Sequence, residues 1–173
     1  MPIANQLTAS AFGSSLLAHS ADAVWAVIRD FNSYPAYIDG VTESHLEDHK
    51  RGDEVGCVRR FVYKGSTIRQ TLTGHSDTEL WFTHAGCDPL DWPVDGENVG
   101  SVDYTNLVQV RRVTDGDRAF VEWSLEFKST NSSDLTHWKR YFEESIPVWL
   151  DSLKTYLDIR AGVSLGNVNS TGN

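Results

Sequence analysis

Five polar residues stand two positions away from apolar residues in segments of alternating pattern, and they are the side chains with which this sequence could do chemistry: Arg59, Gln70, His84, Tyr104 and Asn106. Guanidinium and amide groups can hold a carbonyl or enolate oxygen, whereas an imidazole or a phenol can move a proton. Burying such groups without partners would cost about 1 to 3 kcal/mol each. We therefore expect them to satisfy one another, water or a ligand.

The chemistry of each residue type suggests its role. Arg59, Tyr104 and His84 are the candidate catalytic residues, and Gln70 and Asn106 are candidate ligand-binding residues. Each also has a plain structural alternative: a salt bridge at the sheet edge for the arginine, a half-exposed packing position for the histidine and a core hydrogen bond for the tyrosine.

These positions are read from five segments of period two, at 55–63, 67–74, 78–85, 102–113 and 118–128. In a strand, alternate side chains share one face, and the more apolar set is expected to face the core. The inward sets are Cys57, Arg59, Phe61 and Tyr63; Ile68, Gln70 and Leu72; Leu80, Phe82 and His84; Tyr104, Asn106, Val108 and Val110; and Val121, Trp123, Leu125 and Phe127.

A long amphipathic helix is predicted over 133–159. Apolar residues recur every three or four positions, namely Leu135, Trp138, Phe142, Ile146, Trp149, Leu153 and Leu157, which places them on one stripe. Pro147 removes one backbone hydrogen bond and is expected to bend the helix.

The first forty residues predict a strand over 10–19, a short helix capped by Ser20, and one more helical turn before Gly40. From Val41 onward the period is two. The order of one strand, a helix pair, six strands and a long helix predicts an α+β domain over 1–160, in which a curled antiparallel sheet of about seven strands surrounds the last helix. Residues 161–173 are expected to be a flexible tail.

Aromatic residues are abundant and are expected to line a core or a ligand cavity. The candidate ligand contacts are Phe61, Phe82, Trp92, Trp123, Trp138 and Phe142. Trp92 lies in an aperiodic connection, 86–100, which is long enough to be a binding loop at a cavity mouth or a solvated excursion.

Composition restricts the partners. A formal charge of −9 argues against nucleic acid and anionic membranes, and residues 3–18 have no basic region and too few consecutive large hydrophobic residues for a signal peptide or a membrane span. Cys57 and Cys87 form no metal-type or disulfide pattern, and the His45, Asp48 and His49 group lacks converging spacing. We expect a cytoplasmic protein with free thiols and with neither metal nor cofactor.

Several short pieces together resemble the START or birch-pollen-allergen (SRPBCC) superfamily, and most closely its polyketide cyclase/dehydrase group. They are Ala21-Asp22-Ala23-Val24-Trp25, Asp30-Phe31, Tyr34-Pro35, Val55-Gly56-Cys57-Val58-Arg59-Arg60, Ile68-Arg69-Gln70-Thr71-Leu72, Asp103-Tyr104 and Val121-Glu122-Trp123-Ser124. The resemblance covers about 10–159 and implies a helix-grip fold with a hydrophobic cavity between the sheet and the long helix.

The resemblance also implies an inward arginine at Arg59 and a cavity tyrosine at Tyr104, whereas Gln70 stands where many relatives carry glutamate. An amide cannot act as a general base. Two hypotheses follow. The chain is a cofactor-free enzyme that folds a hydrophobic carbonyl or polyketide-like compound and promotes cyclisation, dehydration or isomerisation, or it is a non-catalytic binder or carrier of a hydrophobic small molecule. Whether the protein forms a homodimer is left open.

Overall fold

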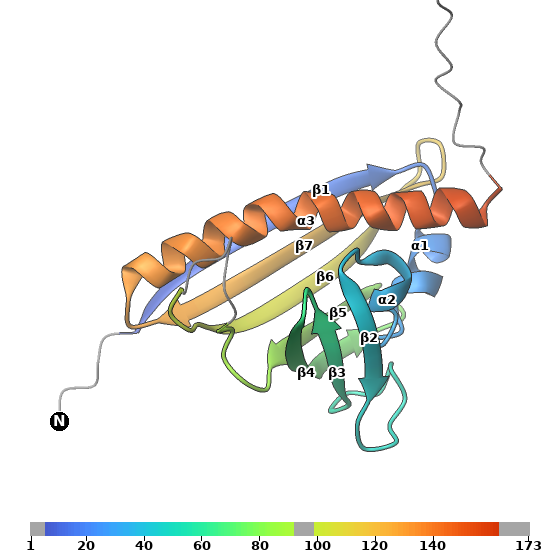
Figure 1. Cartoon of the computed structure of the whole chain (residues 1–173). Helices are drawn as coiled ribbons and strands as arrows, with labels where there is room; N and C mark the ends of the chain where they lie inside the picture. Colours follow the sequence, from blue (N-terminus) through green and yellow to red (C-terminus); the bar gives the residue numbers. More distant parts are fainter. Residues whose placement is uncertain (1–5, 92–98, 163–173) are drawn as a thin grey trace, which may run out of the picture.

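The computed structural model describes residues 6–91 and 99–162. Its elements are β1 (Leu7–Leu17), α1 (Ala21–Ile28), α2 (Tyr34–Tyr37), β2 (Val41–Leu46), β3 (Val58–Tyr63), β4 (Ser66–Ser76), β5 (Trp81–Gly86), β6 (Asp103–Val113), β7 (Arg118–Ser129) and α3 (Ser132–Arg160). The strands form one antiparallel sheet in the order β1-β7-β6-β5-β4-β3-β2. Figure 1 shows α3 running along β1 and β7 while the β2 to β4 end curls away. The predicted helix-grip architecture is confirmed.

Helix α3 covers the inner face of the sheet with the predicted apolar stripe, to which Tyr141 and Leu150 are added. The Asn131 side chain caps its first turn by accepting from the Ser133 N–H at 2.9 Å. Pro147 lies inside the helix, which continues beyond it, and the ribbon changes direction along its length (Figure 1). Gly13 of β1 lies directly under Ile146, so close that a Cβ at position 13 would collide with the isoleucine side chain. The glycine therefore allows the helix to approach the sheet.

The limits of some strands differ from the prediction. The first strand spans 7–17 rather than 10–19, because the chain must turn at His19 before Ser20 caps α1 with its Oγ. The segment predicted from 55 enters the sheet only at Val58, since Gly56 has a φ of +88° and Val55 is exposed. The predicted inward faces are nevertheless confirmed in all five segments.

Two short helices close one end of the sheet. In α1, Trp25 Nε1 and Arg29 Nε both donate to Asp77 Oδ1, at 2.8 and 2.9 Å, which ties the helix to the turn between β4 and β5. The four-residue helix α2 follows and buries Tyr34 and Tyr37. This arrangement holds the Tyr34 ring over the inner face of the sheet.

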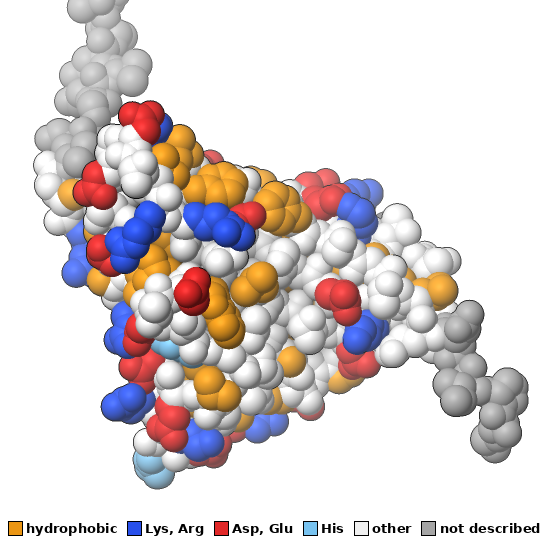
Figure 2. All heavy atoms as spheres, turned by 180° about the vertical axis from the view of Figure 1, so that it is seen from behind, with side chains coloured by type: hydrophobic (Ala, Val, Ile, Leu, Met, Phe, Trp, Pro, Cys, Tyr) orange, Lys and Arg blue, Asp and Glu red, His pale blue; other side chains and the backbone are white. Residues whose placement is uncertain are grey.

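The side opposite to the view of Figure 1 carries mixed polar, charged and hydrophobic side chains (Figure 2). Within the described ranges, none of the helices has the length and hydropathy needed to cross a bilayer. Trp92 and nearly all of the expected tail lie outside the described residues, and the domain limits of 1–160 stay a prediction.

Candidate functional site

The five inward polar residues come from neighbouring strands and are all buried. Arg59 and His84 are 0% exposed, Gln70 and Tyr104 are 5% exposed and Asn106 is 6% exposed. Cross-strand register explains their proximity, because Arg59 pairs with Gln70 and His84 pairs with Asn106. Alternation thus identified one polar cluster from four strands.

Arg59 is held by neutral groups. Its Nε donates to Gln70 Oε1 at 2.9 Å, and its two terminal nitrogens donate to Gln70 Oε1 and to the Phe31 carbonyl, each at 2.5 Å. Its Cζ lies 3.8 Å from the Phe31 ring centroid and 3.4 Å from that of Tyr34. Aromatic faces attract a guanidinium, so the charge is clamped between two rings.

The orientation of the Gln70 amide follows from Arg59. A guanidinium can only donate, so Gln70 must turn its oxygen toward Arg59 and its nitrogen away. That nitrogen donates to Tyr104 Oη at 2.7 Å. Because Tyr104 accepts this bond, its own hydroxyl proton is left to donate elsewhere, and within the described residues it has no acceptor.

Asn106 is oriented by the same rule. The indole N–H of Trp123, which is only a donor, donates to Asn106 Oδ1 at 2.9 Å. The amide nitrogen is thereby turned away from Trp123, and it forms no hydrogen bond within the described part of the chain. Tyr104 and Asn106 are two apart on β6 and share its inner face, so two donors stand side by side.

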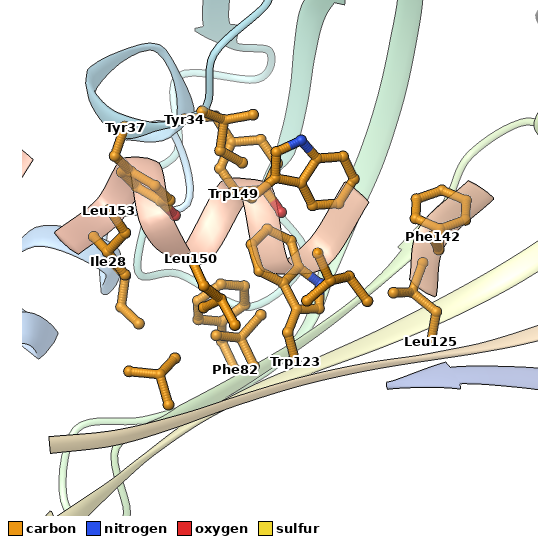
Figure 3. Close-up of a cluster of buried hydrophobic side chains, with 14 of the residues drawn as sticks. Ile28, Tyr34, Tyr37, Phe82, Trp123, Leu125, Phe142, Trp149, Leu150 and Leu153 are labelled. Atoms are coloured by element: carbon orange, nitrogen blue, oxygen red, sulfur yellow. The ribbon is translucent and has the colours of Figure 1, made fainter. Parts of the chain in front are cut away.

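Both donors line an internal cavity between the sheet and α3. Its wall comprises Tyr34, Ile38, Val41, Phe61, Tyr63, Ile68, Gln70, Leu90, Tyr104, Asn106, Trp123, Phe142 and Trp149. The indole rings of Trp123 and Trp149 approach from opposite sides with centroids 5.1 Å apart, beside Tyr34 (Figure 3). The volume of about 30 Å³ suffices for about two water molecules at most.

Six of the predicted site residues are on this wall: Phe61, Gln70, Tyr104, Asn106, Trp123 and Phe142. Four are not. Arg59 and His84 lie behind it, Phe82 stacks on His84, and Trp138 is buried beside Phe142 with its indole nitrogen bonded to the Gly100 carbonyl. Alternation tells which face a side chain occupies but not whether another ring covers it.

His84 is covered by aromatic rings. Phe31 and Phe82 pack against it at centroid distances of 5.3 and 5.9 Å, its Nε2 lies 3.5 Å from Tyr34 Oη, and its Nδ1 has no partner among the described residues. Burial, and secondarily the charge of Arg59, lower its pKa well below 6.5. The imidazole is therefore neutral and does not reach the cavity.

The phenols of the site are proton donors rather than bases at neutral pH. Burial raises the pKa of Tyr104, although the Gln70 hydrogen bond opposes it. Burial likewise raises the pKa of Tyr34 against the opposing charge of Arg59.

Sequence reasoning missed two central wall residues. Tyr34 was expected in a helical turn and Trp149 on the helix stripe, but neither was expected at a ligand. Tyr34 separates Arg59 from the cavity, since its ring covers the guanidinium and also lines the wall. The only sequence signal was an aromatic residue beside Pro35 in a predicted turn.

Larger surface hollows adjoin the cavity, and two of them share only aliphatic wall residues with it. One has about 310 Å³ and shares Ile68 and Leu90 with the cavity wall. The other, between α2 and α3, has about 540 Å³ and shares Ile38 and Val41. Leu90 belongs to the predicted binding loop and is pinned by backbone hydrogen bonds to Val102, so the described part of that loop does reach the cavity.

Comparisons with solved structures support the same fold. The chain resembles XoxI from Bacillus cereus, with 26% identity, a TM-score of 0.70, and coverage of 88% of this chain and 98% of the other. A Bacillus thuringiensis protein described as uncharacterized gives 25% identity, a TM-score of 0.69, and coverage of 86% and 98%. A norcoclaurine synthase from Thalictrum, bound to a transition-state analogue, shares the fold at 12% identity with a TM-score of 0.67, covering 91% and 98%.

Among curated proteins, none matches the chain significantly. A family model described as polyketide cyclase/dehydrase and lipid transport matches residues 13–158. This range runs from β1 to the last turns of α3 and includes every described residue of the cavity wall. The chain therefore belongs to the polyketide cyclase/dehydrase and lipid transport family.

Proposed function

We propose that the protein binds a hydrophobic small molecule in this cavity and holds it by a carbonyl or similar acceptor oxygen. One observation carries the proposal: both amides on the wall turn their oxygens to donor-only groups, Gln70 to Arg59 and Asn106 to Trp123. The Tyr104 hydroxyl and the Asn106 amide nitrogen are thus left as donors at an otherwise aromatic and aliphatic wall. Such a surface matches an apolar ligand with one acceptor.

The ligand must enlarge the cavity, because pockets for drug-sized molecules have roughly 300 to 1,000 Å³. Displacing Ile68 and Leu90 would join the cavity to the adjoining hollow of about 310 Å³. We propose this border as the entrance, rather than the one at Ile38 and Val41, because Leu90 lies outside the strands and is held by an isolated bridge to Val102.

A catalytic role is the second candidate, and the chain of hydrogen bonds from Arg59 through Gln70 to Tyr104 favours it. Successive bonds polarise one another, so the Tyr104 hydroxyl would donate to an oxygen that becomes negative during cyclisation, dehydration or isomerisation. Because the wall offers no carboxylate or imidazole within the described residues, proton abstraction would need a group of the substrate. We therefore rank binding first. We also propose that the protein is cytoplasmic, because Cys57 and Cys87 are free thiols.

The test compares two naphthalenes of the same shape, one with an acetyl substituent and one with an isopropyl substituent. Binding is followed through the fluorescence of Trp123 and Trp149. The Tyr104→Phe variant should bind acetylnaphthalene about tenfold more weakly, which is the loss of one net hydrogen bond, and should bind isopropylnaphthalene unchanged.

Tyr34→Phe is the matched control. Tyr34 also lines the cavity, but its hydroxyl faces Nε2 of His84 at 3.5 Å rather than the ligand. This variant should leave the ratio of the two affinities unchanged. If wild-type protein bound neither probe, or if Tyr104→Phe weakened both equally, the proposed donor role would be wrong.

A further inference from the structure

The charge of Arg59 has no counter-ion in the described structure. Its guanidinium is 0% exposed, and in the described ranges none of the carboxylates lies within 4 Å of it. Its acceptors are an amide and a backbone carbonyl. A buried cation without an anion is unusual, because desolvation is offset only by hydrogen bonds and ring faces.

The titratable groups around Arg59 do not supply the missing negative charge. They are Tyr34 and Tyr37 in α2, Cys57 before β3, His84 on β5 and Tyr104 on β6. Burial raises the pKa of the three phenols and of the thiol and lowers the pKa of the histidine. All five are uncharged at neutral pH, so together with Arg59 they carry one positive charge.

We propose that Gln70 sets the charge of the ligand, and that the cavity takes a hydrophobic oxyanion, such as a carboxylate or an enolate, in preference to a neutral compound. The inference rests on the proposed function. Gln70 contacts Arg59 on one side and lines the cavity on the other. Because an amide leaves the guanidinium charge unneutralised, an anion bound beside Tyr104 and Asn106 would balance the positive charge of Arg59.

Replacing the amide with a carboxylate would neutralise the charge of Arg59 and would remove the Tyr104 donor from the cavity. Glutamate at position 70 would form an ion pair with Arg59 in the present geometry and would accept the Tyr104 proton, which then no longer points to the ligand. The substitution keeps the size of the side chain and gives a buried cation its partner. Gln70→Glu is therefore expected to fold and to disfavour anions.

The experiment measures, by calorimetry at neutral pH, the affinities for naphthoate and naphthamide with the substituent at the same ring position. Wild-type protein should prefer naphthoate. Gln70→Glu should lower the affinity for naphthoate on the order of a hundredfold, because a close like charge adds to the loss of the Tyr104 hydrogen bond, and should lower the affinity for naphthamide only about tenfold, through the loss of that hydrogen bond alone. Arg59→Met, which keeps the apolar stem volume, should also remove the preference for naphthoate.

Gln109→Glu is the matched control. Gln109 lies on β6 outside the cavity wall, where its side chain accepts a hydrogen bond from Arg111 at 2.9 Å. It adds the same charge outside the cavity and should leave the preference intact. Equal binding of the two probes by wild-type protein, or an unchanged preference in Gln70→Glu, would overturn the proposal. Acetylnaphthalene binding reports separately on the proposed function, since it involves no ligand charge.

Discussion

Two donor-only side chains, Arg59 behind the cavity wall and Trp123 on it, decide what the wall offers to a ligand. Arg59 fixes the amide of Gln70 and Trp123 fixes the amide of Asn106, so each amide has only one consistent orientation. The Tyr104 proton becomes available as a consequence. Gln70→Glu changes which group donates at the wall. It should therefore alter which ligands bind without altering the shape of the cavity.

His84 provides a prediction about stability at the residue scale. Its pKa is lowered in the folded state, so the unfolded chain binds a proton first as pH falls below about 6.5. The free energy of unfolding should therefore fall with pH by up to about 1.4 kcal/mol per pH unit from this group. Stability should be highest above this range and should be lost as pH falls.

Urea unfolding near neutral pH and in mild acid measures this contribution. His84→Leu removes the titrating group while keeping an apolar side chain, and its stability should depend less on pH than that of wild-type protein. His45→Leu, on the edge strand β2, is the control and should retain the wild-type dependence. Identical pH dependence in wild-type protein and His84→Leu would contradict the assignment.

At the scale of elements, helix α3 forms a rigid side of the cavity because it is anchored on strand β1. Gly13 admits Ile146 so closely that the helix has a fixed height above the sheet. Other parts of the wall come from the short helix α2 and from the segment around Leu90. Because shorter elements with fewer packing contacts open more readily, we expect the cavity to enlarge at these parts of the wall.

The entrance itself can be tested kinetically. Leu90→Ala shortens a side chain shared by the cavity and the adjoining hollow, so acetylnaphthalene should associate several-fold faster, as measured by stopped-flow fluorescence. Ile38→Ala makes the corresponding change at the border with the α2 to α3 hollow and should leave the rate near that of wild-type protein. Faster association in Ile38→Ala alone would place the entrance between α2 and α3.

For the whole molecule, the cavity lies inside the only core of the described fold, so a ligand bound there is bound by the native state alone. At a concentration about a hundredfold above its Kd, acetylnaphthalene should raise the free energy of unfolding by about 2.7 kcal/mol. Thermal unfolding with and without the probe measures this, and Tyr104→Phe at the same concentration should show a smaller increase. Binding without any increase would indicate that the unfolded chain binds the probe equally well, which contradicts a site formed only by the native fold.

The sequence by itself determined the fold and the inward faces of the strands. Period-two alternation assigned Arg59, Gln70, His84, Tyr104 and Asn106 to the interior, and the stripe from Leu135 to Leu157 required a sheet to cover it. Alternation succeeds here because side chains on a strand have only two directions, and burial of one apolar face decides between them.

Only the tertiary structure decided which inward residues meet the cavity. Strand alternation has no information about α2, which brings Tyr34 over Arg59 and leaves His84 behind the wall. The volume of the cavity is likewise set by rings from distant segments, Trp123 and Trp149, that meet only when α3 packs on the sheet. Depth within a core depends on contacts between elements, and local periodicity does not encode them.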